Sequence, residues 1–393
     1  MTKSTPDSTT PEMPNASGPA KGAKVMKWVV GATAVLSLGV GLQQLGNSIS
    51  ESRSRHQDIE QLMILAKSQE SAGDFAAAWD SLDKAAGITG AGGDTQVAQA
   101  NLAMRWLETR LGPDEERFDA NRFLPVLGRA AAAAVGQRRA DLLAHVGWAQ
   151  VLRSDADAFR SQAKGYYREA LQIDAQNVYA NAMQGYWALW SVSGPRVADE
   201  PRREQVRLYS RDKFARALAV GRERDFVRHL QLNGLEQLDT AKGDAEFIAI
   251  VNGLRTSGEA VPPRTFRDIQ AFYSDRLNPH IQTNPETGAT VVVDSADRRS
   301  FLSALSPAEH MATFVWVFDR AGAVDSDRTF IREYYRAVLQ EAAGQTAQAL
   351  KTLSEARTQV PRDERDWQLA FDRSIGRLST QHPPRGGRSR QSR

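Results

Sequence analysis

Residues 59–88 read IEQLMILAKSQESAGDFAAAWDSLDKAAGI, and they predict two helices that turn back on one another at Gly73. Apolar residues recur three and four positions apart on both sides of this break, and on the first side Leu62, Leu65 and Ala66 fall on one helical face. On the second side, Ala78, Leu82 and Ala85 fall on one helical face, where the two alanines let a neighbouring helix approach and the leucine fills the remaining space. The stretch therefore indicates a helical hairpin.

The same small, large, small pattern recurs twice more along the chain. Residues 334–361, which read YYRAVLQEAAGQTAQALKTLSEARTQVP, repeat the offsets of the first hairpin from the glycine onward. Residues 163–189 repeat the triplet without the glycine. The members of these two copies are Gly344, Ala349, Leu353 and Ala356 in the former, and Ala163, Tyr167 and Ala170 in the latter.

These stretches resemble the tetratricopeptide repeat, a helix-turn-helix unit of about 34 residues. Residues 334–361 match it most fully, since Pro361 stands where the family ends its second helix. Residues 163–189 depart from it, because Ala175 replaces the usual proline and extra residues precede the repeat at 154–158. The resemblance implies an all-α solenoid whose first helices line a concave groove. From the residues alone, the alternative is an unrelated helical bundle with alanine-rich seams.

A concave groove of this kind would bind a protein or a peptide segment, with aromatic side chains as its anchors. The resemblance places two charged and four aromatic residues among the candidate contacts. For each aromatic residue, the alternative is that it packs between neighbouring hairpins. The candidates are Lys67, Glu70, Tyr179, Tyr186, Trp190 and Tyr334.

Residues 25–45 form an apolar run that predicts a transmembrane helix. Its uncharged part, from Trp28, spans about 27 Å at about 1.5 Å per residue, which is enough to cross a bilayer. No small-x-small cleavage pattern follows, so an uncleaved signal anchor is favoured over a cleaved signal peptide or a buried soluble helix. More basic residues precede the run than closely follow it. We therefore expect a single-pass inner-membrane protein with a cytoplasmic N-terminus and periplasmic repeats.

Composition changes along the chain predict its segments. The first residues are rich in Ser, Thr, Pro and Gly, and the last are rich in Arg, Gly and Pro. Pro262 and Pro263 interrupt helix formation, and two short β-prone runs then flank turn residues at 284–288. Such a β-hairpin either packs on helices or protrudes. The predicted segments are a disordered tail 1–24, the anchor 25–45, repeats 46–255, an irregular segment with the β-hairpin 256–325, a helical hairpin 326–378 and a disordered basic tail 379–393.

No standard motif for catalysis or for a cofactor occurs in the chain. A phosphate loop, a zinc-binding HExxH, a nucleophile elbow and a dinucleotide fingerprint are all missing from the sequence. The chain has no cysteine, and its six histidines include no pair four residues apart, so we expect neither a metal nor a cofactor. Its 50 basic and 47 acidic residues are interspersed, so nucleic-acid binding is not expected either.

The sequence thus predicts a noncatalytic, membrane-anchored scaffold that binds protein partners at the cell envelope. One alternative is a structural subunit or a chaperone-like helper of a membrane complex for secretion or envelope assembly. A further alternative is an enzyme with an unfamiliar site in residues 262–324, which would show clustered carboxylates or histidines with shifted pKa values in a pocket. No feature of the sequence sets an oligomeric state.

Overall fold

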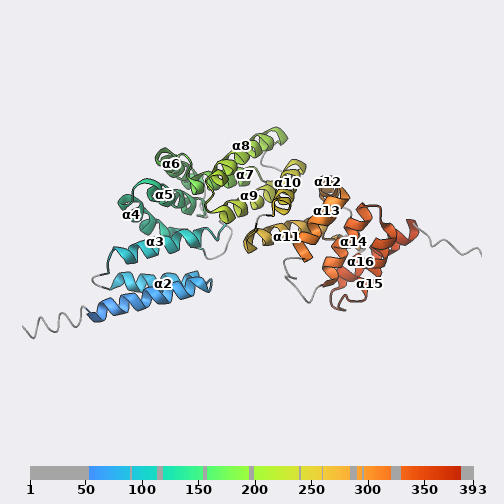
Figure 1. Ribbon diagram of the computed structural model, residues 1–393, viewed down its shortest axis with the longest axis horizontal. Helices are drawn as coiled ribbons and strands as arrows, with labels where there is room; N and C mark the ends of the chain where they lie inside the picture. Colours follow the sequence, from blue (N-terminus) through green and yellow to red (C-terminus); the bar gives the residue numbers. More distant parts are fainter. Residues whose placement is uncertain are drawn as a thin grey trace, which may run out of the picture. The chain divides into compact units, whose positions relative to one another are not determined.

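The described residues form α-helices joined mostly by short turns (Figure 1), and they include one pair of β-strands. The computed structural model describes residues 53–88, 91–112, 118–153, 157–193, 199–238, 240–258, 260–283, 290–293, 296–319 and 329–381. The chain falls into two compact units, Met1–Gln99 and Ala100–Arg393. The boundary lies inside one helix, α3. The all-α prediction is confirmed for the described residues.

The first unit holds a helix over residues 53–71, then α2 (Phe75–Gly87) and the start of α3 (Gly93–Leu107). The second unit continues with η1 (Ala120–Phe123), α4 (Leu124–Ala133), α5 (Gly136–Val151), α6 (Asp157–Ile173), α7 (Val178–Trp190), α8 (Glu200–Ala219), α9 (Arg224–Leu238), α10 (Ala241–Ser257), α11 (Pro263–Leu277), β1 (His280–Thr283), β2 (Thr290–Val293), α12 (Ala296–Ser303), α13 (Pro307–Phe314), the π-helical turn η2 (Val315–Asp319), α14 (Thr329–Ala342), α15 (Thr346–Arg357) and α16 (Arg365–Gln381).

The first predicted hairpin is confirmed by the helix of residues 53–71 and α2. Gly73 has φ +82° in the turn between them, a backbone conformation that favours glycine. The side chain of Asp74 then caps α2 by accepting a hydrogen bond from the Ala77 amide at 3.0 Å. The predicted seam of Ala78, Leu82 and Ala85 is buried. Local capping and the small-residue face thus act together to form this hairpin.

The predicted face of the first helix is only partly correct. Ala66 is buried, as expected, whereas Leu65 is 47% exposed. The apolar residues of this helix occupy a wider part of its circumference than the neighbouring helices cover. Some of them, such as Leu65, are therefore exposed.

The last predicted hairpin is confirmed by α14 and α15, with Gly344 at φ +74° in the turn. The predicted seam residues of α15, Ala349, Leu353 and Ala356, are buried. A third helix, α16, packs against α15. It continues to Gln381, so residues 379–381 are helical, and the prediction that the tail begins at 379 is wrong at those positions.

The middle copy of the pattern lies on α6, which packs along α5. Ala163, Tyr167 and Ala170 are all buried. Gly147 of α5 faces the ring of Tyr167 so closely that a methyl group there would lie 2.9 Å from a ring carbon. One large residue therefore fits into the gap that a glycine leaves on the neighbouring helix.

Successive helices of the second unit pair as α5 with α6, α7 with α8 and α9 with α10. The first helix of each pair also packs on the first helix of the next, from α5 through α7 and α9 to α11. We call α5, α7, α9 and α11 the inner row. This arrangement agrees with the side-by-side first helices that the sequence resemblance implies.

The predicted β-hairpin is present in the second unit. β1 and β2 pair antiparallel, with His280 opposite Val293 and Thr283 opposite Thr290. β2 contacts α16, so the hairpin packs on a helix, as one of the two alternatives proposed. A pair of short strands is marginal alone in water, and a packed helix supplies the support it needs.

Several predictions concern residues that the structure does not describe. The N-terminal tail 1–24, the anchor 25–45 and residues 382–393 of the basic tail lie outside the described residues and stay predictions. Within the described ranges, no helix combines the length and apolar character that crossing a bilayer requires.

Candidate partner-binding groove

Tyr179 and Tyr186, two of the predicted contact residues, lie in the core around α7. They are 5% and 1% exposed. The centroid of the Tyr179 ring lies 4.4 Å from that of His145, and the Tyr186 ring lies 5.7 Å from Trp148. Burial raises the pKa of Tyr186 to about 12. Both tyrosines therefore pack between neighbouring hairpins, and their buried rings are not accessible to a partner.

Tyr334 is also buried, at 1% exposed. Its ring packs edge-on against Trp367 and Phe371 of α16, with centroid distances of 5.5 and 5.2 Å. The predicted exposure of Tyr334 on an open first helix is not found, because α16 covers this side of α14. Here too the ring takes the packing role.

The other predicted contacts are more accessible. Lys67 is exposed and Glu70 is partly exposed on the helix of residues 53–71. Trp190 is partly exposed at the end of α7 and stacks on Trp187, with 4.9 Å between ring centroids. Whether these three residues touch a partner stays a prediction.

Polar side chains join the inner row at its N-terminal ends. The Arg222 guanidinium forms a two-pronged ion pair with Asp141, at 2.8 and 3.1 Å. His145 Nε2 lies 3.0 Å from Glu108 Oε1, and Arg264 of α11 donates a hydrogen bond to the backbone oxygen of Glu108 at 2.8 Å. These groups are engaged in contacts within the fold, so they hold helices together instead of presenting charge to a ligand.

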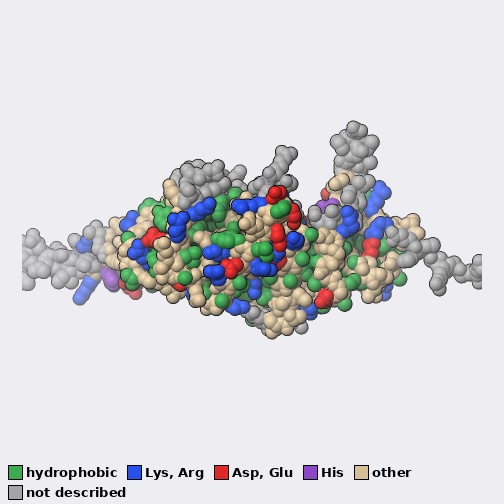
Figure 2. Space-filling model, turned by 90° about the horizontal axis from the view of Figure 1, so that it is seen from above, with side chains coloured by type: hydrophobic (Ala, Val, Ile, Leu, Met, Phe, Trp, Pro, Cys, Tyr) green, Lys and Arg blue, Asp and Glu red, His purple; other side chains and the backbone are tan. Residues whose placement is uncertain are grey.

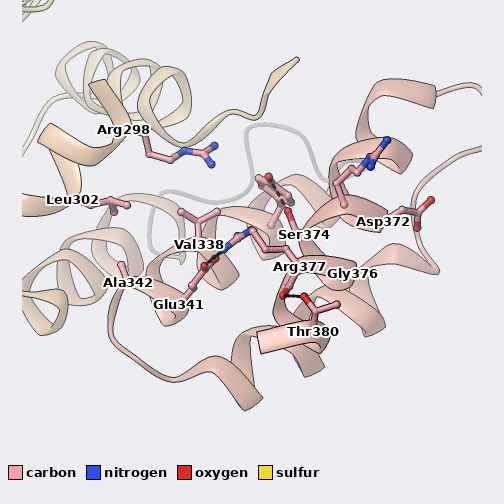
Figure 3. Close-up of a pocket in the computed structure, with 12 residues that line it drawn as sticks. Arg298, Leu302, Val338, Glu341, Ala342, Asp372, Ser374, Gly376, Arg377 and Thr380 are labelled. Atoms are coloured by element: carbon pink, nitrogen blue, oxygen red, sulfur yellow. Dashed lines mark hydrogen bonds and ion pairs between the residues drawn. The ribbon is translucent and has the colours of Figure 1, made fainter. Parts of the chain in front are cut away.

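A cavity of about 830 Å³ lies between α12, α14 and α16 (Figure 3). Its charges are largely satisfied inside the fold. Arg377 forms an ion pair with Glu341, and Asp372 accepts a hydrogen bond from Arg357 Nε at 2.7 Å. Arg298 donates to two backbone oxygens at the end of α11, both at 2.6 Å. The cavity is therefore the weaker candidate for a charged ligand.

A second recess, of about 860 Å³, lies between α6 and α8 with α7 as its floor. We call it the α6–α8 groove. Each helix contributes residues spaced three or four apart, so each presents one continuous face to it. The lining residues are Lys164, Tyr167, Arg168, Leu171 and Gln172 from α6, Gln184, Trp187, Ala188 and Ser191 from α7 and the turn after it, and Arg202, Gln205, Val206, Tyr209 and Lys213 from α8.

The charge of this groove is one-sided. Four basic side chains line it, and no Asp or Glu is among its described lining residues. Lys164, Arg168 and Arg202 are exposed, and Lys213 is partly exposed. Figure 2 shows basic, acidic and hydrophobic side chains intermixed on one face of the chain. The groove thus offers positive charge to anything that enters it.

Three carboxylates on the flanking helices pair with arginines that do not line the groove, and one of them, Asp212, also acts electrostatically on Lys213. The hydrogen bond from Arg207 holds the pKa of Glu204 at about 2, which keeps this carboxylate ionised within its own pair. The pairs are Glu169 with Arg139, Glu204 with Arg207 and Asp212 with Arg216, at N–O distances of 2.8, 2.8 and 2.9 Å.

Aromatic and amide groups complete the groove. Trp187 is partly exposed in its floor, and Tyr209 is 46% exposed on α8. Lys213 Nζ donates to Asn181 Oδ1 at 3.3 Å and lies 5.6 Å from the centre of the Tyr209 ring. Burial lowers the pKa of Lys213, and a bound anion would raise it again. The arrangement suits noncovalent binding of an anionic group next to an apolar one.

The α6–α8 groove is not among the predicted contacts, because the family resemblance implies a groove lined by the first helices. A signal does exist, since Lys164, Arg168 and Gln172 recur at intervals of four, as do Tyr209 and Lys213. That spacing defines one face on each helix. It does not reveal that the two faces border the same recess, which depends on how α6 and α8 pack on α7.

The fold and the groove together describe a scaffold of antiparallel helical hairpins with an open, basic recess. No family model matches the sequence, and no curated protein matches it. Among solved structures, the chain is similar to a tetratricopeptide repeat protein from Parabacteroides merdae, with 13% identity and a TM-score of 0.32, over 82% of this chain and 99% of that one. The tetratricopeptide resemblance therefore rests on the sequence motifs and on the helix pairing described above.

Proposed function

We propose that this protein is a noncatalytic scaffold that is held at a membrane by residues 25–45 and binds a protein partner through its helical hairpins. In this proposal the N-terminus is cytoplasmic and the hairpins face the periplasm. The apolar run and the excess of basic residues before it support the orientation.

One observation carries the binding proposal: the α6–α8 groove is open, contains exposed aromatic surface and carries four basic side chains without a lining carboxylate among its described residues. Unpaired charge at the surface of a recess contributes little to folding stability. It does attract and orient a partner of opposite charge. Such a groove is what a binding module requires.

Attachment to a membrane adds to this function in a physical way. A tethered binder meets membrane-associated partners at a raised effective concentration, so that a modest affinity suffices to assemble a complex. A helical scaffold contributes binding surfaces to such a complex and needs no chemistry of its own.

The test is crosslinking in intact cells, followed by affinity purification and mass spectrometry. Full-length protein is compared with one variant lacking residues 1–24 and another lacking residues 1–47. The tethered scaffold predicts the same set of envelope proteins with the first two forms and loss of that set with the third. The deletion of 1–24 serves as the matched control, because it shortens the tail and keeps the predicted anchor.

Two outcomes would contradict the proposal. Recovery of the full-length protein alone would remove the evidence for a partner. Recovery of the same partners without residues 1–47 would show that the anchor is not needed for binding.

A further inference from the structure

We infer that the α6–α8 groove binds an acidic peptide segment that carries an aromatic or aliphatic anchor residue. This inference rests on the proposed function and names the chemistry of the partner. Lys164, Arg168, Arg202 and Lys213 would receive the carboxylates, and the floor around Trp187 would receive the anchor.

Charge complementarity is the first argument for an acidic partner. The groove gathers basic side chains from two helices, although the whole chain is nearly balanced at a net charge of +3. The acidic residues Glu169 and Asp212 on those helices are engaged by Arg139 and Arg216. No Asp or Glu is among the described lining residues, so the groove keeps a local excess of positive charge, which would speed association with an anionic segment.

The polar groups between the basic residues favour a peptide. Gln172, Gln184 and Gln205 line the groove. The amide oxygens of Gln184 and Gln205 accept hydrogen bonds from Tyr209 Oη at 3.4 Å and from Arg202 at 3.2 Å, so these two side chains offer their NH2 donors, while Gln172 carries both a donor and an acceptor. A peptide backbone presents the same two groups at every residue except proline. Carboxylates alone would not require amide partners of this kind.

The shape of the groove argues against a lipid surface as its occupant. The floor on α7 lies between α6 and α8, and a flat bilayer contacts what protrudes and not what is recessed. Trp187 is held in this floor by stacking on Trp190 at 4.9 Å and an interplanar angle of 23°. A rigid aromatic group in a recess suits a single inserted side chain, because little conformational entropy is lost on binding. On this view Trp190 supports the contact from behind.

The direct test uses the full-length protein in detergent and an array of peptides of roughly ten residues, a length that extends beyond the groove. Each peptide is present in a Glu-rich, a Gln-rich and a Lys-rich version, with and without a tryptophan. We expect the Glu-rich, tryptophan-containing peptides to bind best. Raising the salt concentration from about 50 mM to about 300 mM should weaken that binding roughly threefold to tenfold, because exposed charges are screened.

Charge reversal locates the site. Lys164→Glu with Arg168→Glu should weaken binding of the Glu-rich peptides roughly tenfold or more. Arg211→Glu with Arg362→Glu is the matched control: it changes the net charge equally at exposed positions outside the groove, and should leave affinity within about twofold. Far-UV circular dichroism confirms that both double variants fold.

Equal binding of the Glu-rich and Gln-rich peptides, or equal loss in both double variants, would overturn the inference. So would competition by vesicles of phosphatidylglycerol and phosphatidylcholine that abolishes peptide binding at low salt and depends on Lys164 and Arg168, since it would assign the groove to lipid. If the crosslinked envelope proteins persist in the Lys164→Glu, Arg168→Glu variant, the groove is not their site, although the scaffold function stands. Loss of all partners on deletion of the anchor does not alter the peptide result, so the two proposals fail separately.

Discussion

Single residues show how closely the helices of this scaffold approach one another. Gly147 on α5 and Gly165 on α6 are both helical glycines, yet their surroundings are opposite. A methyl group at Gly147 would lie 2.9 Å from a ring carbon of Tyr167, whereas at Gly165 no atom lies within 4 Å of such a group apart from the chain neighbours and the helix's own backbone. The sequence contains both glycines without any mark that distinguishes them.

This contrast predicts opposite effects of one substitution. Gly147→Ala should destabilise the protein by about 1–3 kcal/mol, because the buried ring cannot move aside freely. Gly165→Ala should stabilise it by about 0.5–1 kcal/mol, because alanine loses less backbone entropy in a helix. Thermal unfolding of the two full-length variants in the same detergent measures both. A shift in the same direction for both would mean that α5 and α6 are not packed as described.

Glu236 on α9 predicts a pH effect on stability. Burial, with a contribution from Asp275, raises its pKa from the ordinary 4.5 to about 7. The folded state therefore holds a proton that the unfolded state releases, so its contribution to stability is fully present below about pH 4.5 and is lost as pH rises through about 7. Glu236→Gln removes this loss. Between about pH 5 and about pH 8, the free energy of unfolding of the variant should rise relative to that of the wild type by on the order of 1–2 kcal/mol.

Unfolding midpoints of wild type and Glu236→Gln across that pH range check the sign. The exposed Glu60→Gln variant controls for removal of a carboxylate at a position without burial. A difference between variant and wild type that stays constant with pH, or shrinks as pH rises, would contradict the burial of Glu236.

At the scale of helices and strands, prediction succeeded where the determinants are local. Gly73 and Gly344 occupy left-handed turns, as the repeats predict, whereas the helix before Gly73 begins at residue 53 and not at 59. The β-hairpin was also evident from the turn residues that separate its strands. Each of these elements is set by neighbours in sequence: a capping side chain, a turn glycine or alternating apolar residues. The covering of α14 by α16 was not predicted, because an amphipathic helix does not specify which surface it covers.

Asn177 connects the start of α7 to α5, and this predicts a larger effect than a helix cap alone. Its Oδ1 accepts from the Ala180 amide at 2.9 Å, and its Nδ2 donates to Asp141 at 2.7 Å in the core. Asn177→Ala should cost about 2–3 kcal/mol, because the cap is lost and a buried acceptor loses a donor. Asp199→Ala, at the exposed cap of α8, should cost only about 1 kcal/mol.

Urea denaturation of these two variants separates the contributions. If Asn177→Ala and Asp199→Ala lower the midpoint equally, the bond between α7 and α5 adds nothing beyond capping. If neither variant changes the midpoint, the assigned caps themselves are wrong.

At the scale of the whole molecule, the repeat brings residues from separate hairpins to shared surfaces. The inner row packs α5, α7, α9 and α11 side by side, and the α6–α8 groove forms where three helices meet. The proposed anchor would hold these surfaces beside a membrane. Crosslinking of the anchor variants tests membrane attachment, and the peptide array tests binding in the groove.

Local sequence was sufficient to identify the helical hairpins, the β-hairpin and the small-residue seams, because turn glycines, capping groups and apolar periodicity act over a few residues. Burial of Tyr179, Tyr186 and Tyr334 was settled by packing, since each ring is covered by helices distant in the chain. The same holds for the groove. The basic residues of the groove can be identified in the sequences of α6 and α8. The recess that brings them together forms only because both helices pack on α7.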